Sequence, residues 1–493
     1  MKSKSFIKDF LLYGLNNVLA KVLAIVVVPI ITSVFSVGEF GIIDTGISVL
    51  TVLPLLVGLG YDMVLKRDLI IYKQDRKKSQ DTIFTMLLFV AVWGALAVVV
   101  MSLFSTPLAR LLFTSDEYSS AMLFALISVY FNTFIGFIIV LCRTSFKLVR
   151  FTIISILKLL LEYGFIIYAI IVLEKGVVGY FGAICLVDFA YAIVLLIIYR
   201  KALAGRFNIP ILKESLKFGI PTMVAGLGYW IFNLSDRILI TNLSNSTQTG
   251  YYSMAIKMLG VYTFLVTAFK QAWVPRAFEL FREDKDTFPR HLERMHHYSL
   301  AFFSFMVLAN FAGLRLMIML FSNPDYLPGL VIAAPLVMAF ILYPLAEVAS
   351  IGLYLSGKTK ALSNVVWIAA VINIAINVIW IPVYGSIIAS ASTLASYLFI
   401  YVTYWWMSCH YMKWRFSWFK PVFVLVMAAG SILGICIISI ENIWLDLLCK
   451  LAITAVFLGI MLATRLIRID YIKKTIIYFF KRKETVKSGS ESN

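Results

Sequence analysis

Residues 119–173 read SSAMLFALISVYFNTFIGFIIVLC (119–142), RTSFKLVR (143–150) and FTIISILKLLLEYGFIIYAIIVL (151–173). Two long apolar segments flank a short basic break. Because a helix rises 1.5 Å per residue, about 20 apolar residues cross the hydrocarbon core of a bilayer, which is about 30 Å thick. This stretch therefore predicts two membrane-spanning helices joined by a positively charged loop.

The same alternation continues along the chain of 493 residues, which is 61% hydrophobic and only 14% charged. That composition fits neither a soluble globule nor a disordered chain. We predict an all-α polytopic membrane protein with about 14 transmembrane helices. The predicted spans are roughly residues 10–33, 42–65, 82–104, 119–142, 151–173, 180–199, 218–242, 250–275, 298–321, 330–355, 362–382, 385–409, 421–440 and 447–466.

The polar breaks between the apolar segments alternate in charge. About 35 of the 44 Lys and Arg residues lie in every second break, and the breaks between these carry almost none. Because short cytoplasmic loops are enriched in Lys and Arg, we expect a multi-pass protein of the cytoplasmic membrane with both termini inside. The net charge of +18 then faces anionic lipid headgroups, so no nucleic-acid partner is expected. The basic breaks are Lys2–Lys8, Lys66–Lys78, Arg143–Arg150, Arg200–Lys217, Arg276–Arg294, Lys358–Lys360, Lys413–Lys420 and Arg465–Lys487.

The short breaks leave no room for a soluble catalytic or nucleotide-binding domain, so we expect no enzyme and no cofactor. The five cysteines are scattered without C-x-x-C spacing. Three of the four histidines, His291, His296 and His297, fall in one predicted loop, and we expect no metal site there.

One motif resembles a phosphate-binding loop. Gly352-Leu-Tyr-Leu-Ser-Gly357-Lys358-Thr359 matches G-x-x-x-x-G-K-[ST], which works only between a strand and a helix. Here it closes an apolar span, where backbone amides are already bonded within the helix. We predict instead that Gly357 ends that helix and that Lys358 anchors it at the membrane surface.

Six helices apart, the chain repeats short glycine motifs. Phe40-Gly41-Ile42-Ile43-Asp44 corresponds to Thr249-Gly250-Tyr251-Tyr252-Ser253. A repeat of an even number of helices keeps its orientation, which predicts two parallel lobes with substrate between them at the midplane. We place the N-terminal six-helix lobe at residues 1–200 and the C-terminal six-helix lobe at 201–410. Two additional helices and a basic cytoplasmic tail occupy residues 411–493.

Three motifs in the second half of the chain resemble those of a known family. They are Phe218-Gly-Ile-Pro221, Asn233-Leu-Ser-Asp236-Arg237 and Thr249-Gly-Tyr-Tyr-Ser253-Met-Ala-Ile-Lys257. It resembles the polysaccharide-transport family of bacterial flippases, which handle O-antigen and other oligosaccharide repeat units. Their superfamily also holds the multidrug and toxin extrusion (MATE) antiporters and the lipid II flippases. The resemblance implies a MATE-like pair of lobes and transfer of an undecaprenyl-pyrophosphate-linked oligosaccharide to the outer leaflet by alternating access.

Several cations lie inside predicted spans, where each costs about 2.5–3.5 kcal/mol on insertion scales. Such a cost indicates a hydrated, functional cavity. We expect these cations to attract the pyrophosphate or acidic sugars of the substrate. The candidates are Lys21 with Asn17 on the same helical face, Arg237 with Asn233, Lys257, Arg315 and Lys270; the last lies near the cytoplasmic boundary, where snorkelling is the favoured alternative.

Carboxyl groups inside spans are candidates for coupling to H⁺ or Na⁺. Lys158 and Glu162 are spaced i,i+4 and could equally neutralise each other. Asp236 could instead form a structural contact between helices. Asp44 lies near the end of a predicted span, so it could lie at the membrane interface. The coupling candidates are Asp236, Glu162, Lys158, Asp188 and Glu347.

Polar stripes mark two further helices: Asn373 and Asn377 on one, and Ser390, Thr393 and Tyr397 on the next. Small and hydroxyl residues at such spacing usually indicate close helix packing, which we favour over sugar contact.

The favoured function is an ion-coupled flippase for lipid-linked oligosaccharide, with the polyprenyl tail along a groove beside the last two helices. Anionic lipids and other polysaccharide-assembly membrane proteins are the expected partners. A cation-coupled multidrug exporter and a lipid II flippase remain alternatives. A membrane glycosyltransferase is disfavoured because the outer breaks are short.

Overall fold

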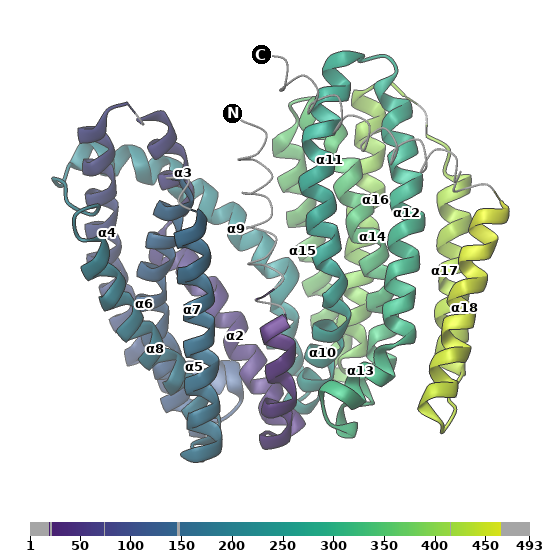
Figure 1. Cartoon of the computed structure of the whole chain (residues 1–493), viewed down its shortest axis with the longest axis horizontal. Coiled ribbons are helices and arrows are strands. Elements are labelled where there is room, and N and C mark those ends of the chain that lie inside the picture. Colours follow the sequence, from purple (N-terminus) through teal and green to yellow (C-terminus); the bar gives the residue numbers. More distant parts are fainter. Residues whose placement is uncertain (1–18, 20–21, 73, 145–147, 415, 465–493) are drawn as a thin grey trace, which may run out of the picture. The chain divides into compact units, whose positions relative to one another are not determined.

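The computed structural model describes residues 19, 22–72, 74–144, 148–414 and 416–464, and it is helical without strands over these residues (Figure 1). Short 3₁₀ or π turns join several of the helices. The helices are α2 (Val37–Gly58), α3 (Tyr61–Ile71), α4 (Arg76–Leu103), α5 (Ser105–Phe113), α6 (Ser119–Thr144), α7 (Leu148–Ile167), α8 (Gly176–Tyr199), α9 (Ile209–Leu243), α10 (Ser246–Leu259), α11 (Thr263–Glu283), α12 (Phe288–Ala312), α13 (Leu314–Phe321), α14 (Gly329–Leu355), α15 (Thr359–Tyr384), α16 (Ile387–Tyr411), α17 (Phe419–Ile437) and α18 (Ile443–Ala463).

The predicted polytopic membrane fold is confirmed. Among the described residues, 11 helical segments are long and apolar enough to cross a membrane, or 12 if the bent pair α12 and α13 forms one span. Two further predicted spans also contain helix, namely Val22–Val34, which is a shorter apolar helix, and α9, which carries Asp236 and Arg237.

Two predicted spans are each divided between two helices, so their prediction as single helices was wrong. The predicted span 42–65 divides at Leu59 and Gly60, both of which have left-handed backbone conformations, with φ of 45° and 80°. A Cβ on Gly60 would lie 2.2 Å from the Gly219 carbonyl oxygen, so this turn requires glycine. The span 298–321 bends by 51° between α12 and α13, whereas the predicted span 250–275 lies within one continuous run, Ser246–Glu283, that includes the 3₁₀ turn Gly260–Tyr262.

By its internal contacts the described chain forms two compact units that are discontinuous in sequence. Unit 1 comprises Met1–Phe269, Leu314–Leu336 and Thr359–Ile400. Unit 2 comprises Lys270–Gly313, Val337–Lys358 and Tyr401–Asn493. The lobes at 1–200 and 201–410 and the segment 411–493 stay predictions.

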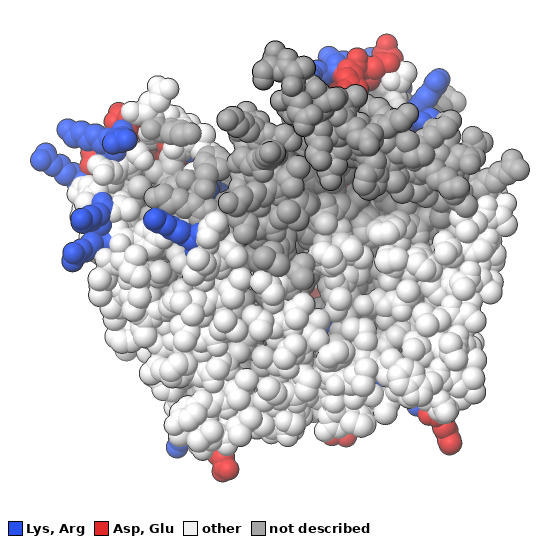
Figure 2. Space-filling view, in the orientation of Figure 1, with Lys and Arg blue, Asp and Glu red and all other residues white. Residues whose placement is uncertain are grey.

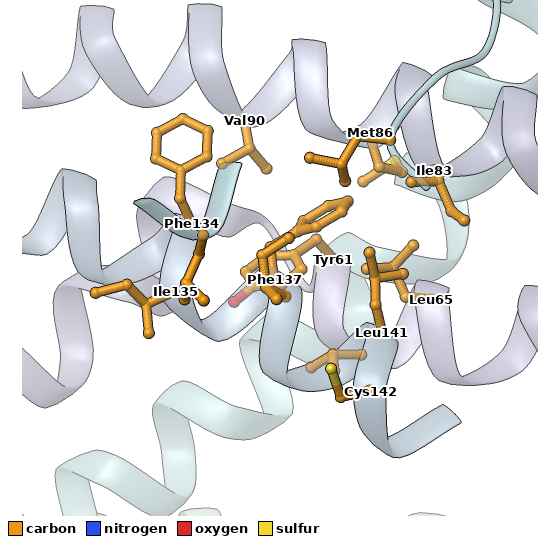
Figure 3. Packing of buried hydrophobic residues seen from close by; sticks show 14 of the residues in the cluster. Tyr61, Leu65, Ile83, Met86, Val90, Phe134, Ile135, Phe137, Leu141 and Cys142 are labelled. Carbon is orange, nitrogen blue, oxygen red and sulfur yellow. The ribbon is translucent and has the colours of Figure 1, made fainter. Parts of the chain in front are cut away.

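One core of unit 1 lies between α3, α4 and α6 (Figure 3). The rings of Tyr61 and Phe137 stack at 5.4 Å, and the Tyr61 hydroxyl donates to the Thr133 carbonyl oxygen at 3.2 Å. Met86 and Val90 of α4 pack against them without exposure. Because lipid tails are as apolar as these side chains, this packing stabilises the helices through van der Waals contact more than through water exclusion.

The glycine motifs of the predicted repeat pack against each other where α2 crosses α10. A Cβ on Gly41 would lie 2.1 Å from the Ser246 carbonyl oxygen, and a Cβ on Gly250 would lie 2.1 Å from the Val37 carbonyl oxygen. Gly41 and Gly250 are 209 residues apart, and so are Val37 and Ser246. The contact is therefore reciprocal, as a two-fold relation between the repeats requires, and it holds the two backbones close enough to exclude any side chain.

Charged side chains of unit 1 gather at the ends of its helices. In Figure 2, Lys and Arg of the α3–α4 region cluster at one end, while the flank below them is uncharged. Apolar side chains in the middle of α4 and near the end of α8 are exposed, among them Val92 and Ile198 (both 65%). This is the surface that a bilayer would cover.

Gly357 follows α14 in a left-handed conformation, with φ of 68°. The amides of Gly357 and Lys358 donate back to the carbonyl oxygens of Tyr354 and Leu353. The prediction that this glycine ends the helix is confirmed.

The histidine prediction was wrong in its placement. His291, His296 and His297 lie within α12 rather than in a loop, because α12 begins at Phe288, well before the predicted span. His296 is fully buried in unit 2, where its Nε2 lies 2.8 Å from the Tyr401 hydroxyl.

Candidate functional site

Two cations share one carboxylate where α2, α9 and α10 meet in unit 1. Arg237 Nε of α9 donates to Asp44 Oδ2 of α2 at 2.9 Å, and Lys257 Nζ of α10 lies 3.8 Å from Asp44 Oδ1. Arg237 Nη1 also donates to the Asn233 carbonyl oxygen one turn earlier. Asp44 and Arg237 are only 9% and 7% exposed. We call Asp44, Arg237 and Lys257 the cation site; these three groups carry one excess positive charge between them, and the Asp236 carboxylate also interacts electrostatically with Arg237.

Lys257 is the less engaged of the two cations. Its distance of 3.8 Å to Asp44 exceeds that of a hydrogen bond, and its ammonium lies 4.5 Å from the centroid of the Phe40 ring. The side chain is 29% exposed. An ammonium has three donors, and none forms a hydrogen bond in the described contacts. Lys257 is therefore the cation best able to bind an added anion.

Asp236 lies beside Arg237 in sequence but is bonded to neutral groups. Its carboxylate accepts from the Tyr252 hydroxyl at 2.5 Å, from Asn377 Nδ2 at 2.8 Å and from the Thr393 hydroxyl at 3.1 Å. Its side chain is 1% exposed. These bonds tie α9 to α10, α15 and α16.

The two polar stripes meet in the same network. Asn377 Nδ2 also donates to Asn373 Oδ1 at 3.1 Å, and the Ser392 hydroxyl donates to Asn377 Oδ1 at 2.7 Å. Asn373, Asn377 and Ser392 have no exposed surface. In this structure the stripes join helices, the arrangement we favoured over sugar contact. The Tyr397 hydroxyl donates to Asn233 Oδ1 at 3.2 Å.

A second cluster has the opposite charge balance, because two carboxylates contact one cation. Lys158 Nζ donates to Glu162 Oε1 at 2.6 Å within α7 and lies 3.1 Å from Asp188 Oδ1 of α8. The Ser128 hydroxyl of α6 donates to Asp188 Oδ2 at 2.6 Å. The side chains of Lys158, Glu162 and Asp188 are 13%, 14% and 0% exposed. We call these three residues the buried triad.

The other predicted residues lie apart from these clusters. In unit 2, Lys270 Nζ lies 2.6 Å from Glu347 Oε1, with both side chains partly exposed; the lysine thus pairs with a carboxylate inside the protein. Arg315 is half-buried at the start of α13, the short helix that packs against α10. Lys21 and Asn17 lie outside the described residues.

Sequence reasoning misplaced Asp44 and missed an ion pair. Asp44 was expected at a span end, but α2 begins at Val37, so this carboxylate is two turns inside the helix. Asp446 and Lys450 form a buried ion pair at 2.8 Å on α18. Their i,i+4 spacing was a usable signal, but Asp446 fell one residue before the predicted span.

The chemistry of both clusters is electrostatic. Among the described residues no group of three or more His, Cys, Asp or Glu side chains could hold a metal ion. The cation site offers ammonium and guanidinium donors to an anion, and the buried triad offers carboxylate oxygens to a proton or a cation. Charged clusters of this kind in membrane helices ordinarily mark a functional site, so the class is a multi-pass membrane protein with a polar site among its helices.

The comparisons agree with this class. The polysaccharide biosynthesis protein family matches residues 6–281, more than half of the chain, and the chain belongs to that family. It is accordingly a multi-pass membrane protein of the polysaccharide biosynthesis family. No curated protein sequence matches the chain.

Solved structures show the same fold at low sequence identity. Lipid II flippase MurJ, in an inward closed conformation, aligns with a TM-score of 0.69 at 13% identity, covering 92% of this chain and 98% of its own. An inward-facing multidrug resistance MATE family transporter aligns with a TM-score of 0.59 at 14% identity. The alignment covers 81% of this chain and 94% of the transporter. The Vibrio cholerae MATE transporter VcmN aligns at 0.54 and 13% identity, covering 83% and 97%. The predicted resemblance to this superfamily is confirmed.

Proposed function

We propose that the chain translocates undecaprenyl-pyrophosphate-linked oligosaccharide from the inner to the outer leaflet of the cytoplasmic membrane by alternating access, coupled to an ion. The observation that carries the proposal is the cation site, where Arg237 and Lys257 share Asp44 among membrane helices. An excess positive charge there favours an anionic substrate headgroup.

The weak Lys257–Asp44 contact supports a binding step. When a pyrophosphate approaches, Lys257 replaces its 3.8 Å contact with the Asp44 carboxylate by short charge-assisted hydrogen bonds to the phosphate oxygens. Arg237 keeps its bond to Asp44 and so remains fixed, while its charge adds to the attraction. The network around Asp236 holds α9 in place during this exchange.

A groove on unit 2 supports the placement of the lipid tail. Phe305 and Ala309 of α12, together with α18, line an open groove of about 310 Å³ that is almost wholly apolar. A polyprenyl chain remaining in lipid could lie along it, as we expected for the last two helices. The α18 residues in the lining are Leu451, Thr454, Ala455, Leu458, Gly459 and Leu462.

The test uses host cells that lack the chromosomal copy and carry the wild-type gene, an empty vector or a variant. Undecaprenyl-pyrophosphate glycans are located by an impermeant glycosidase on intact spheroplasts. We expect outward glycan with the wild type and glycan trapped inside with the vector or with Lys257→Met. Lys66→Met is the matched control, because Lys66 forms a surface pair with Asp62. Outward glycan in the vector strain would contradict the proposal.

The same strains separate the alternatives. Lipid II trapped inside, with other glycans displayed normally, would identify a lipid II flippase. Resistance to cationic dyes that depends on the gene would identify a multidrug exporter. We favour the flippase because an excess of positive charge at the cation site opposes a cationic substrate.

A further inference from the structure

We propose that the buried triad of Lys158, Glu162 and Asp188 binds one proton shared by its two carboxyl groups, and that this proton is the coupling ion. The coupling role rests on the proposed flippase function, whereas proton binding is independent of it. A proton on either carboxyl leaves one carboxylate facing one ammonium, which removes the excess negative charge.

Charge balance is the first argument. Glu162 and Asp188 are nearly or fully buried near the middle of the apolar segments Val149–Val172 and Gly176–Tyr199. An uncompensated carboxylate at such a depth costs about 2.5 kcal/mol or more. Lys158 neutralises only one of the two, so a second positive charge is required.

Geometry is the second argument. Glu162 and Asp188 approach the same Lys158 ammonium, at 2.6 and 3.1 Å. Asp188 Oδ1 is buried and forms no hydrogen bond in the described structure, although Oδ2 accepts from Ser128. This oxygen is ion-paired with the Lys158 ammonium at 3.1 Å and has no hydroxyl or amide donor, so it can carry the shared proton. Because the two acids interact strongly, the proton belongs to the pair and not to either residue.

Among the described residues, the groups around the triad add no competing charge at neutral pH. The titratable groups that face the triad are Tyr163 on α7, and Tyr180, Cys185 and Tyr191 on α8; α6 contributes the neutral Ser128. Phenols and thiols are ordinarily protonated at that pH. Tyr180 is buried, and its ring packs against Phe35 and Phe181.

Other carboxylates fit a coupling role less well. Glu347 is matched one to one by Lys270 and is partly exposed. Asp236 has both oxygens occupied by neutral donors. Neither has a second carboxylate on the same cation in the described structure.

The experiment measures proton uptake by the purified full chain in nanodiscs, without substrate, as the pH falls from about 8 to about 5. Infrared difference spectra report the protonated carboxyl group. We expect one carboxyl proton in the wild type, and its loss in both Glu162→Gln and Asp188→Asn, because each variant leaves one acid per lysine. Glu162→Asp should retain the proton. Asp62→Asn, at the surface pair with Lys66, is the control that also retains it.

Four results would overturn the assignment: no such proton in the wild type, the proton retained in both neutral variants, its loss in Glu347→Gln, or its displacement by Na⁺ but not by choline. If one neutral variant does not fold, the other decides the test. Glycan location in the same variants separates the two proposals. Proton binding without flipping in the wild type refutes the flippase, and flipping with the proton abolished refutes only the coupling role.

Discussion

The cation site and the buried triad are opposite arrangements of the same parts. In the first, Arg237 and Lys257 share Asp44; in the second, Glu162 and Asp188 share Lys158. Both lie among membrane helices of unit 1. The difference teaches that the sign of the excess charge, rather than the presence of an ion pair, indicates what a membrane site can bind. An excess cation attracts a headgroup, and an excess carboxylate attracts a proton.

The two sites also differ in their scaffold. The cation site lies beside the α2–α10 crossing, where Gly41 and Gly250 bring backbones together. The triad lies between α6, α7 and α8, where a Cβ added to Gly164 of α7 would meet nothing within 4 Å. The first scaffold tolerates no added atoms, whereas Gly164 lies on the exposed face of α7 and is not part of a close helix contact.

The largest expected effect comes from Arg237→Met. It leaves the buried Asp44 with only the 3.8 Å contact to Lys257, and the free energy of unfolding should fall by about 3–5 kcal/mol. Fluorescence-detected unfolding of the purified protein in micelles measures this. Adding Asp44→Leu should recover much of the stability but not the flipping. A double variant no more stable than the single one would show that the ion pair does not hold the site together.

Gly41→Ala should destabilise the protein by about 1–3 kcal/mol, because the new Cβ meets the Ser246 carbonyl oxygen at 2.1 Å. Gly164→Ala is the matched control and should be neutral or slightly stabilising, since alanine favours helix. The same unfolding measurement checks both. Equal effects would mean that the α2–α10 crossing is not a tight contact.

Lys257→Met separates binding from stability. Its side chain is 29% exposed and only loosely paired, so the free energy of unfolding should change by no more than about 1 kcal/mol. Affinity for undecaprenyl pyrophosphate should fall about tenfold or more, equivalent to about 1.4 kcal/mol. Thermophoresis with a fluorescent analogue measures the affinity, and Lys257→Arg should restore part of it. Unchanged affinity would remove Lys257 from the site.

The smallest effect is expected for Tyr180→Phe. The ring remains packed, so stability should change by less than about 0.5 kcal/mol. Loss of the hydroxyl removes no charge, because a phenol is ordinarily protonated near neutral pH, so the dependence of undecaprenyl pyrophosphate affinity on pH should stay unchanged. Titrations of affinity at several pH values compare the variant with the wild type. A changed pH dependence would show that the Tyr180 hydroxyl takes part in one of the two sites.

Much of the architecture could be predicted from the sequence because membrane constraints are local. The length of an apolar run sets a span, and the glycine motifs at Gly41 and Gly250, which indicated a repeat, contact each other's helices in the structure. The pairing of Lys158 with Glu162 followed from i,i+4 spacing on one helix. The helix breaks at Gly60 and Gly313 were missed because apolar runs continue through them.

Only the tertiary structure decided which charges meet. Asp44 reaches Arg237 across 193 residues, and Asp188 joins Lys158 from a neighbouring helix. A sequence gives the spacing of side chains along one helix, but the rotation of each helix about its axis depends on packing against all its neighbours. The excess charge of each site is a sum over several helices, so it exists only once those helices are packed.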